Sequence, residues 1–264
     1  MNIAVVPARN EQGRIGKVVT LLCETKIEKV IVVVNGSFDN TMREIKSLKR
    51  SNVEILYFKQ TLGIDIPRSI GAYAAFKQGA DSVVFVDGDM IGDILALVND
   101  LVFAIISNGI DLAMTNCYPD IYMPYGNELT EQILTFRALL NMSLGIYRKV
   151  GVATPSHGPH AVSRRLLEHV DFRDFAVPPV VLAFAVKHGF SVDVAGNLHQ
   201  NKLGSKIKNY SHAKKIADTI IGDTLEALYY FNDKPRSRKY LYREFLGYNP
   251  GRRFDILEKI LKKY

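Results

Sequence analysis

Over the first 90 residues, short runs of β-branched residues alternate with amphipathic segments, and this alternation limits the possible folds more than any other feature. Val and Ile dominate the runs, as is typical of strands that are buried on both faces. The runs cover residues 3–6, 29–34, 53–58 and 83–86. The segments between them, which we expect to be helices, cover residues 14–23, 42–48 and 67–79. Strands and helices in alternation, joined by short polar loops, predict an α/β protein with a mostly parallel, doubly wound sheet.

Each predicted strand is followed by a loop that is rich in polar residues and turn formers. These loops cover residues 7–11, 35–41 and 62–68, and the Asp-Gly-Asp sequence at 87–89. The carboxyl ends of parallel strands share one edge of the sheet, and ligands of doubly wound sheets bind outside that edge. The sequence therefore predicts one ligand site that four loops build together.

The fourth predicted strand ends in two carboxylates, and a buried strand does not carry these unless their charge is compensated. Asp87 and Asp89 are two residues apart, so on an extended chain their side chains point the same way. Two hard oxygen ligands at a strand end suit Mg²⁺ or Mn²⁺, which then binds a phosphate-bearing substrate. Gly88 leaves room for a ligand to approach the backbone. The alternative is a turn in which both aspartates are solvated.

The second half of the chain is less regular, and its elements are predicted one by one. Strands are expected at residues 112–115 and 191–195, with a loop that enters a strand at 157–162. Helices are expected at residues 93–106, 128–148, 164–169, 178–188, from a Ser211 cap onward, and in an amphipathic turn at 256–261. The buried side of the 128–148 helix is expected to carry Ile133, Leu134, Phe136, Leu139, Leu140 and Leu144. We find no repeat or linker, so we expect one domain over residues 1–210 and a helical extension over residues 211–264.

The composition of the chain indicates which partners it binds and in which compartment it lies. The net charge of +7 favours an acidic partner, such as a nucleotide phosphate, a phosphorylated acceptor or an anionic membrane surface. No basic-aromatic stacking motif accompanies this charge, so we expect no nucleic acid partner. The two cysteines show no pairing pattern, and we see neither a signal peptide nor an apolar run long enough to span a bilayer. We therefore expect a cytoplasmic protein whose membrane contact, if it has any, is peripheral.

Taken together, the four loops resemble the N-terminal half of glycosyltransferase family 2. The resemblance is carried by Pro7-Ala8-Arg9-Asn10-Glu11, by residues 33–41, by residues 63–68 and by Asp87-Gly88-Asp89. It implies a GT-A fold, which is a Rossmann-like sheet with helices on both faces, and a transferase that uses a UDP- or GDP-linked sugar with Mn²⁺ or Mg²⁺. It also implies that residues 1–90 bind the nucleotide sugar and that residues 91–210 bind the acceptor.

The resemblance assigns roles to the residues that match its motifs. The residues implied to bind the nucleotide sugar are Pro7, Arg9, Glu11, Asn35, Ser37, Gly63, Arg68, Asp87 and Gly88. Asn35 stands where many relatives have Asp, and it can still hydrogen-bond a base or ribose. Alternatively, Ser37 and Asp39 only cap the next helix. Arg68 is alternatively an exposed residue in the first turn of a helix. Asp87 and Asp89 match the metal-binding, catalytic pair, and His199 is the preferred third ligand because retaining relatives place a histidine after the corresponding strand.

The implied reaction needs a protein base only if the sugar is transferred with inversion. By rough register, inverting members place that carboxylate near Val177-Pro178, where this chain has none. Asp174 and Asp171 are the nearest acids, and we interpret both as solvated loop residues. We therefore expect retention, with a small anionic or lipid-linked acceptor on the loop that contains His157, Gly158 and His160. A tight structural turn is the alternative for this loop.

Several readings stay open at this stage. Lys202, Lys206, Lys208, Lys214 and Lys215 either clamp an anionic substrate or form a solvated helix start. The basic and aromatic stretch over residues 236–253 suits an anionic membrane surface or a homodimer contact. A sugar-phosphate nucleotidyltransferase is disfavoured because no glycine-rich basic loop follows the first strand. A non-catalytic sugar-nucleotide-binding protein is disfavoured because the chain keeps both Asp87 and Asp89.

Overall fold

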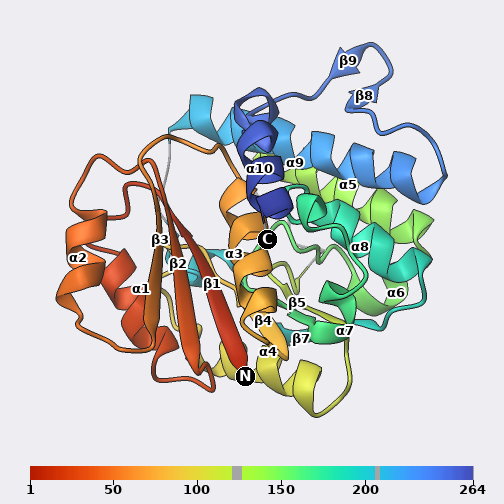
Figure 1. Cartoon of the computed structure of the whole chain (residues 1–264). Helices are drawn as coiled ribbons and strands as arrows, with labels where there is room; N and C mark the ends of the chain where they lie inside the picture. Colours follow the sequence, from red (N-terminus) through yellow and green to blue (C-terminus); the bar gives the residue numbers. More distant parts are fainter. Residues whose placement is uncertain (121–126, 206–208, 264) are drawn as a thin grey trace.

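Strands from both halves of the chain form one central sheet in the order β3-β2-β1-β4-β6-β5-β7 (Figure 1). The computed structural model describes residues 1–120, 127–205 and 209–263. The strands are β1 (Asn2–Ala8), β2 (Lys29–Asn35), β3 (Val53–Phe58), β4 (Ser82–Phe85), β5 (Leu112–Asn116), β6 (His160–Ser163) and β7 (Val192–Asn197). Only β6 runs antiparallel to its neighbours β4 and β5. The expected mostly parallel α/β sheet is confirmed.

Helices cover both faces of the sheet because the strands are apolar on both sides. In β1, Ala4 and Val6 face a core that is completed by α1 (Ile15–Leu22) and α4 (Leu95–Ile106). Ile3 and Val5 point the opposite way, toward α3 (Ile66–Lys77) and α8 (Pro178–Lys187). This is the period-two alternation of a strand, and all four residues are fully buried. Helix α2 (Thr41–Ser47) lies beside α1.

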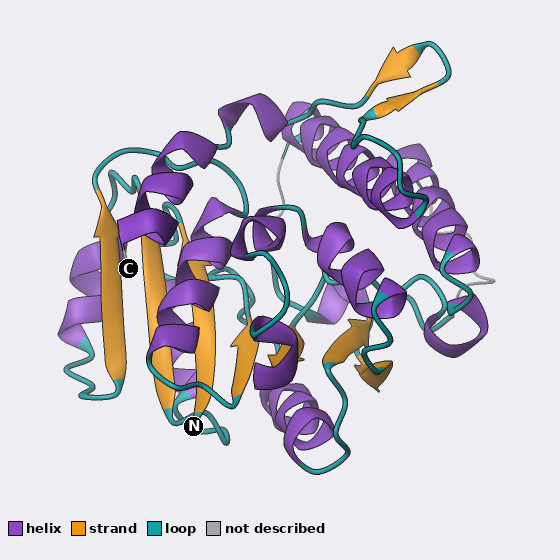
Figure 2. Ribbon diagram, turned by 45° about the vertical axis from the view of Figure 1, so that its right-hand side comes forward, coloured by secondary structure: helices purple, strands orange, loops and turns teal. Residues whose placement is uncertain are grey.

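The second half of the chain adds a helical layer at one side of the sheet. Its elements are α5 (Glu128–Ser143), α6 (Tyr147–Val150), α7 (Arg164–Leu167), η1 (Phe172–Ala176), η2 (Gln200–Lys202) and α9 (Tyr210–Phe231). The long helices α5 and α9 lie side by side, with Ile133 and Phe136 against Ile221 and Leu225 (Figure 2). No helix within the described ranges is long and apolar enough to cross a membrane.

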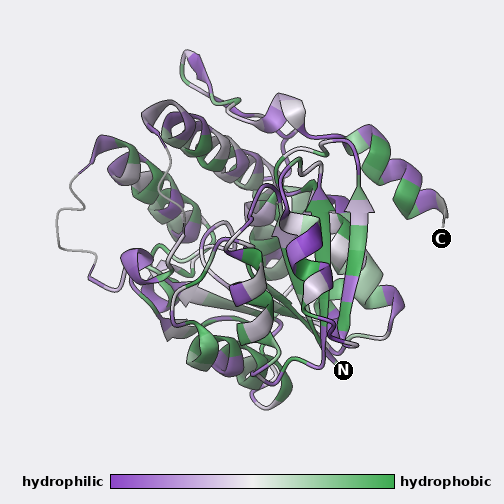
Figure 3. Ribbon diagram, turned by 90° about the vertical axis from the view of Figure 1, so that its left-hand side faces the viewer, coloured by the Kyte–Doolittle hydropathy of each residue, from purple (hydrophilic) through white to green (hydrophobic). Residues whose placement is uncertain are grey.

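After α9 the chain forms an exposed hairpin and then returns over the N-terminal half. The hairpin is β8 (Lys239–Tyr240) and β9 (Arg243–Glu244), and it is followed by η3 (Asn249–Gly251) and α10 (Phe254–Lys263). Helix α10 is amphipathic, whereas the strands of the sheet are hydrophobic along most of their length (Figure 3). Leu257 on α10 is fully buried against Leu62 and Ile66, so the end of the described chain packs at the start of α3.

Three expectations about the second half are wrong in detail. The helix expected over residues 128–148 ends at Ser143, because Gly145 adopts a φ of +73° that a helix cannot continue. Leu139 is 44% exposed instead of buried, and Arg137 on the same helix is only 1% exposed. Helix α9 is capped by Asn209, whose side chain accepts a hydrogen bond from the His212 amide, and not by Ser211.

Candidate active site

The loops after β1 and β4 meet where the order of the strands reverses. From β1 the chain moves outward to β2 and β3, and then returns to place β4 on the other side of β1. The Gly88 amide donates a hydrogen bond to the Pro7 carbonyl over 3.1 Å. A Cβ atom on Gly88 would lie 2.9 Å from that carbonyl and 3.2 Å from Ile15. On this side, the room that we expected for a ligand beside Gly88 is therefore filled by the protein itself.

Asp87 and Asp89 lie at this reversal, directly beyond the end of β4. The Asp87 carboxylate is 36% exposed, and it pairs with Arg68, whose Nη2 lies 2.5 Å from Asp87 Oδ1. Asp89 is only 8% exposed. Arg68 is itself buried at the start of α3, so its alternative reading as an exposed residue is wrong. Burial lowers the pKa of Arg68, but the charges of Asp87 and Asp65 outweigh burial and raise it.

The loops after β1 and β2 are tied together by side chains of the second loop. Ser37 Oγ accepts a hydrogen bond from the Asn10 amide over 3.0 Å, and Asp39 accepts one from the Gln12 amide over 3.1 Å. Asp39 also accepts a hydrogen bond from the amide of Thr41, the first residue of α2, although the N-cap position is Asn40, whose side chain makes no capping hydrogen bond. Burial raises the pKa of Asp39, but these hydrogen bonds outweigh burial and lower it. This network fixes the loop of Pro7, Arg9 and Glu11, in which Arg9 is exposed and Glu11 half-buried.

Asn35 and Gly63 shape the loop that leads into α3. Asn35 is 6% exposed, its Oδ1 accepts a hydrogen bond from the Leu62 amide, and its Nδ2 donates one to the Gly63 carbonyl. Gly63 has a φ of +87°, and a Cβ atom there would lie 2.2 Å from the Gly251 carbonyl. Both residues thus hold the chain in a conformation that brings Arg68 to Asp87.

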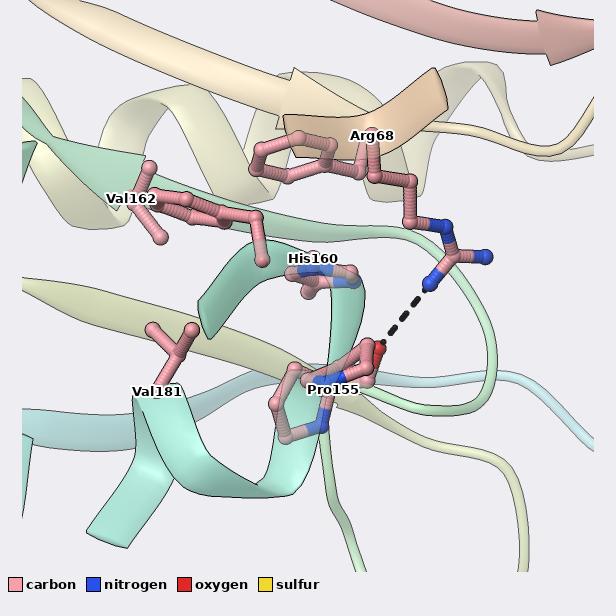
Figure 4. A pocket seen from close by; sticks show the side chains of 8 residues that line it. Arg68, Pro155, His160, Val162 and Val181 are labelled. Atoms are coloured by element: carbon pink, nitrogen blue, oxygen red, sulfur yellow. Dashed lines mark hydrogen bonds between the residues drawn. The ribbon is translucent and has the colours of Figure 1, made fainter. Parts of the chain in front are cut away.

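The loop that carries His157 and Gly158 reaches the same edge because β6 is antiparallel. An antiparallel strand begins where its parallel neighbours end, and His160 is paired with Phe85, the last residue of β4. His160 is 3% exposed, its ring lies 4.9 Å from the Phe85 ring, and it lines a small cavity with Arg68 and Pro155 (Figure 4). Burial lowers the pKa values of His157 and His160 to about 3. Both rings are therefore neutral at pH 7.

The segment that carries His199 lies against the loop that follows Asp89. The Gly92 amide donates a hydrogen bond to the Leu203 carbonyl over 2.9 Å. Arg14 Nη1 donates to the Gly204 carbonyl over 2.8 Å and to the Asp89 carbonyl over 3.3 Å. In residues 1–120, 127–205 and 209–263, however, no three His, Cys, Asp or Glu side chains are gathered closely enough to hold a metal ion.

Comparison with known proteins identifies the family. The sequence model of the family described as "Glycosyl transferase family 2" matches residues 3–171, which is more than half of the chain. The chain belongs to glycosyl transferase family 2. It is therefore a glycosyltransferase, and the resemblance carried by the first 90 residues is confirmed. A comparison with curated proteins found no match.

Solved structures share the fold of this glycosyltransferase. Glucosyl-3-phosphoglycerate synthase from Mycobacterium tuberculosis in complex with UDP is 20% identical, with a TM-score of 0.63 over 92% of this chain and 85% of that one. The complex of the same synthase with Mn²⁺, UDP-glucose and phosphoglyceric acid is 21% identical, also with a TM-score of 0.63, over 92% and 84% of the two chains. At these identities the likeness establishes a common fold.

Asp171 and Asp174 differ in exposure and in hydrogen-bond partners. The carboxylate of Asp174 is 7% exposed and accepts two hydrogen bonds from Arg236, over 2.7 and 3.0 Å. Its reading as a solvated loop acid is therefore wrong. Asp171 is exposed, as expected, and accepts a hydrogen bond from the Arg173 amide at the start of η1.

The basic residues near the C-terminus do not form one surface. Arg238 and Arg252 are each 6% exposed, and both pair with the buried carboxylate of Asp223. Their reading as part of a membrane or dimer surface is wrong. Of the lysines after His199, Lys202, Lys214 and Lys215 are exposed, whereas Lys206 and Lys208 lie outside the described residues.

Sequence reasoning missed the burial or the partners of three arginines. They are Arg14, Arg137 and Arg252. For Arg137 there was a signal, because the residue lies three positions before Leu140 and three after Leu134, in the apolar stripe of the helix. For Arg14 and Arg252 no local pattern points to their partners, which are 75 and 187 residues away.

Proposed function

We propose that this glycosyltransferase moves a sugar from a nucleoside diphosphate sugar to a small anionic acceptor, with retention of configuration. The observation that carries the proposal is the position of Asp87 and Asp89 at the reversal point of the sheet, with Arg68 paired to Asp87. Solved structures of similar fold hold UDP-glucose and phosphoglyceric acid, so UDP-glucose is the first donor to test and phosphoglycerate the first acceptor.

Asp87 and Asp89 would hold a divalent cation, Mn²⁺ or Mg²⁺. The donor set fits, because both are carboxylates in the turn that directly follows β4, and hard cations prefer such oxygens. His199 would be the third ligand, since its segment packs on the loop that follows Asp89. When bound, the cation stabilises negative charge on the leaving diphosphate. Arg68 supplies a second positive group beside Asp87 for the oxygens of the diphosphate.

The donor nucleoside would lie over the loops after β1 and β2. Pro7, Arg9, Glu11 and Ser37 line this part of the edge, and the hydrogen bonds between the two loops hold it in place. Asn35 acts there mainly by positioning, because its amide already binds the backbone of Leu62 and Gly63. One N–H and one lone pair of its side chain remain for a base or ribose.

The surroundings of Asp174 and Asp171, the acids nearest to the position where inverting relatives place a base, support retention. Asp174 is committed to Arg236, and Asp171 lies on the surface. In a retaining transfer the acceptor hydroxyl attacks C1 on the face from which the diphosphate departs. The C1–oxygen bond to the diphosphate breaks, the bond to the acceptor oxygen forms, and the hydroxyl proton passes to the departing diphosphate. No carboxylate of the protein takes part in this transfer of the proton.

Replacing Asp89 tests this proposal. We expect Asp89→Ala to lower Mn²⁺-dependent release of UDP from UDP-glucose by about 100-fold or more, because the charge on the leaving group is no longer stabilised. Asp93→Ala is the matched control, since Asp93 is an exposed aspartate four residues away. The anomeric configuration of the product, read by NMR, tests retention. Unchanged Mn²⁺-dependent turnover in Asp89→Ala contradicts the assignment.

A further inference from the structure

We propose that Arg137 binds an oxyanion of the acceptor, a phosphate or carboxylate group, together with Thr154, Ser156 and His157. The inference rests on the proposed function, because it names the part of the site that selects an anionic acceptor. It adds a binding group on α5 that lies outside the loops at the carboxyl edge of the sheet.

Arg137 is a buried charge with no acidic partner among the described residues. Its side chain is 1% exposed, and its Nε and Nη2 atoms are buried without a hydrogen-bond partner in the part of the chain that the structure describes. An arginine stays protonated in proteins, so the charge cannot be removed by losing a proton. Burial lowers the pKa of Arg137 and outweighs the opposing effect of its neighbours Tyr118 and Cys117.

Two other buried arginines of the chain show what a structural arginine looks like in this fold. Arg238 donates to the carboxylates of Asp223 and Glu226 and to two backbone carbonyls. Arg252 binds Asp223 through two hydrogen bonds and Asp65 through a third. Their donors are matched by acceptors, as buried polar groups normally are. Arg137 departs from this pattern and has two donors left for a ligand.

Residues 154–157 carry further buried polar atoms that have no hydrogen-bond partner among the described residues. They are Thr154 Oγ1, Ser156 Oγ and His157 Nε2. Asn141, one helical turn after Arg137, holds this loop against α5 by donating to the carbonyls of Gly151 and Ala153 over 2.7 and 3.0 Å. The positive charge of Arg137 is also among the causes that lower the pKa of His157. The guanidinium of Arg137 thus lies near a neutral imidazole, and two buried hydroxyls are on the same short loop as that imidazole, a set of groups that suits an oxyanion.

The same loop also contacts the donor side of the site. Arg68 Nη1 donates to the Pro155 carbonyl over 3.4 Å (Figure 4). Nη2 of the same guanidinium binds Asp87. The charges of Asp87 and Arg68 both affect the pKa of His157. Residues 154–157 therefore connect Arg137 on α5 with Arg68 and Asp87 at the end of β4. A small acceptor whose anionic end is held by Arg137 has its other end directed to the donor.

Thermal unfolding with added inorganic phosphate, in the absence of any donor, tests the inference. We expect phosphate to raise the melting temperature of the full chain. We expect Arg137→Met to abolish this increase, and Arg137→Lys to weaken phosphate binding about tenfold because the two-pronged geometry is lost. Without phosphate, Arg137→Met should be at least as stable as the parent, since an unpaired buried charge has been removed. If the role of Arg137 is purely structural, Arg137→Met should instead be less stable than the parent without phosphate.

Two controls make the outcome decisive. Arg148→Met removes an exposed arginine shortly after α5 and should keep the full response to phosphate. Ser156→Ala removes one unpartnered hydroxyl and should reduce the response without loss of stability. Acetate in place of phosphate tells whether a carboxylate alone is accepted. The inference is overturned if the parent does not respond to phosphate, if Arg137→Lys and Ser156→Ala respond as the parent does, or if Arg137→Met unfolds.

This test is separate from that of the proposed function, because no sugar nucleotide is present in it. UDP with Mn²⁺ should stabilise Arg137→Met as it does the parent. With phosphoglycerate as acceptor, Arg137→Met should raise KM for phosphoglycerate by about tenfold or more, whereas Arg148→Met should not change it. If the parent does not release UDP from UDP-glucose, the proposed function is contradicted, but the result of the phosphate experiment is unaffected.

Discussion

His160 is a histidine whose surroundings oppose a positive charge. It is 3% exposed, its ring is stacked on Phe85, and burial lowers its pKa to about 3. In the unfolded chain the pKa of a histidine is about 6.5. Between these two values the unfolded state binds a proton that the folded state does not. The free energy of unfolding therefore falls as the pH decreases below about 6.5.

The expected loss of stability is large enough to measure. One such histidine lowers the free energy of unfolding by about 1.4 kcal/mol for each pH unit below about 6.5, until the folded-state pKa is reached. Denaturant unfolding at pH 5.0 to 7.0 tests this before most carboxylates titrate. His160→Phe should keep the stacking on Phe85 and reduce the slope, whereas His188→Phe, at an exposed position, should leave it unchanged. Equal slopes in all three proteins would show that His160 does not titrate as its burial implies.

At the scale of residues, the sequence predicted positions better than partners. Asp87 and Asp89 could be placed at the carboxyl edge because the buried strand before them ends at Phe85, whereas the turn that they form with Gly88 and Met90 was not predicted. The contacts of Asn35 could not be predicted, since its amide binds the backbone of Leu62 and Gly63, which are 27 and 28 residues away in the sequence. The burial of Arg137 was missed because helical periodicity is used to assign apolar residues, and not arginines, to the buried side of a helix.

The loop before α3 depends on a glycine for its conformation and its packing. Gly63→Ala places a Cβ atom 2.2 Å from the Gly251 carbonyl, and the backbone has a φ of +87°. We expect this variant to lose stability and to bind the donor more weakly, because the 62–68 loop must separate from Gly251 and move Arg68. The matched control is Gly79→Ala, which has a φ of +79° and nothing within 4 Å of the new atom.

The two variants separate the effect of contact from that of backbone strain. Gly79→Ala should cost about 1 kcal/mol, the strain of an alanine in the left-handed region. Gly63→Ala should cost clearly more and should also raise KM for the sugar nucleotide. Chemical denaturation and donor titration measure the two effects. Similar costs for both variants, with unchanged donor binding, would mean that the packing on Gly251 does not support the site.

At the scale of elements, local patterns were sufficient in the first half and insufficient in the second. The strands and helices up to α4 begin and end within about two residues of their predicted bounds, because each is a short amphipathic or apolar run between turn formers. The direction of β6 could not be read from His-Ala-Val-Ser, since a short apolar strand has the same pattern in either orientation. Its antiparallel pairing depends on β4 and β5, which are distant in sequence.

Across the whole molecule, a chain of alternating charges connects the C-terminal extension to the candidate active site. Asp87 pairs with Arg68, Arg68 with Asp65, and Asp65 with Arg252. Arg252 also pairs with Asp223 on α9. We propose that residues 211–264 are therefore more than an appendage to residues 1–210, because they supply the guanidinium that holds Asp65 at the start of α3.

Replacing Arg252 tests this role. Arg252→Met leaves Asp65 and Asp223 with one cationic partner each, and we expect a loss of about 2–4 kcal/mol in the free energy of unfolding. We also expect a lower kcat, since Asp65 is then free to draw Arg68 away from Asp87. Arg253→Met is the control, because the adjacent arginine is 42% exposed and pairs only with Asp255 among the described residues. If both variants keep parental kcat, the charges do not transmit an effect to Asp87.

The return of residues 249–257 to the N-terminal half bears on how the protein is made. The Arg253 amide binds the Leu62 carbonyl, and Leu257 fills the space beside Ile66. A chain that leaves the ribosome from its N-terminus completes β1 to α3 long before these residues emerge. During that interval β1 to β3 can form, but the loop over residues 62–68 lacks its contacts with residues 249–257. Nascent chains are thus expected to gain catalytic competence abruptly, once α10 has docked, and not gradually during elongation.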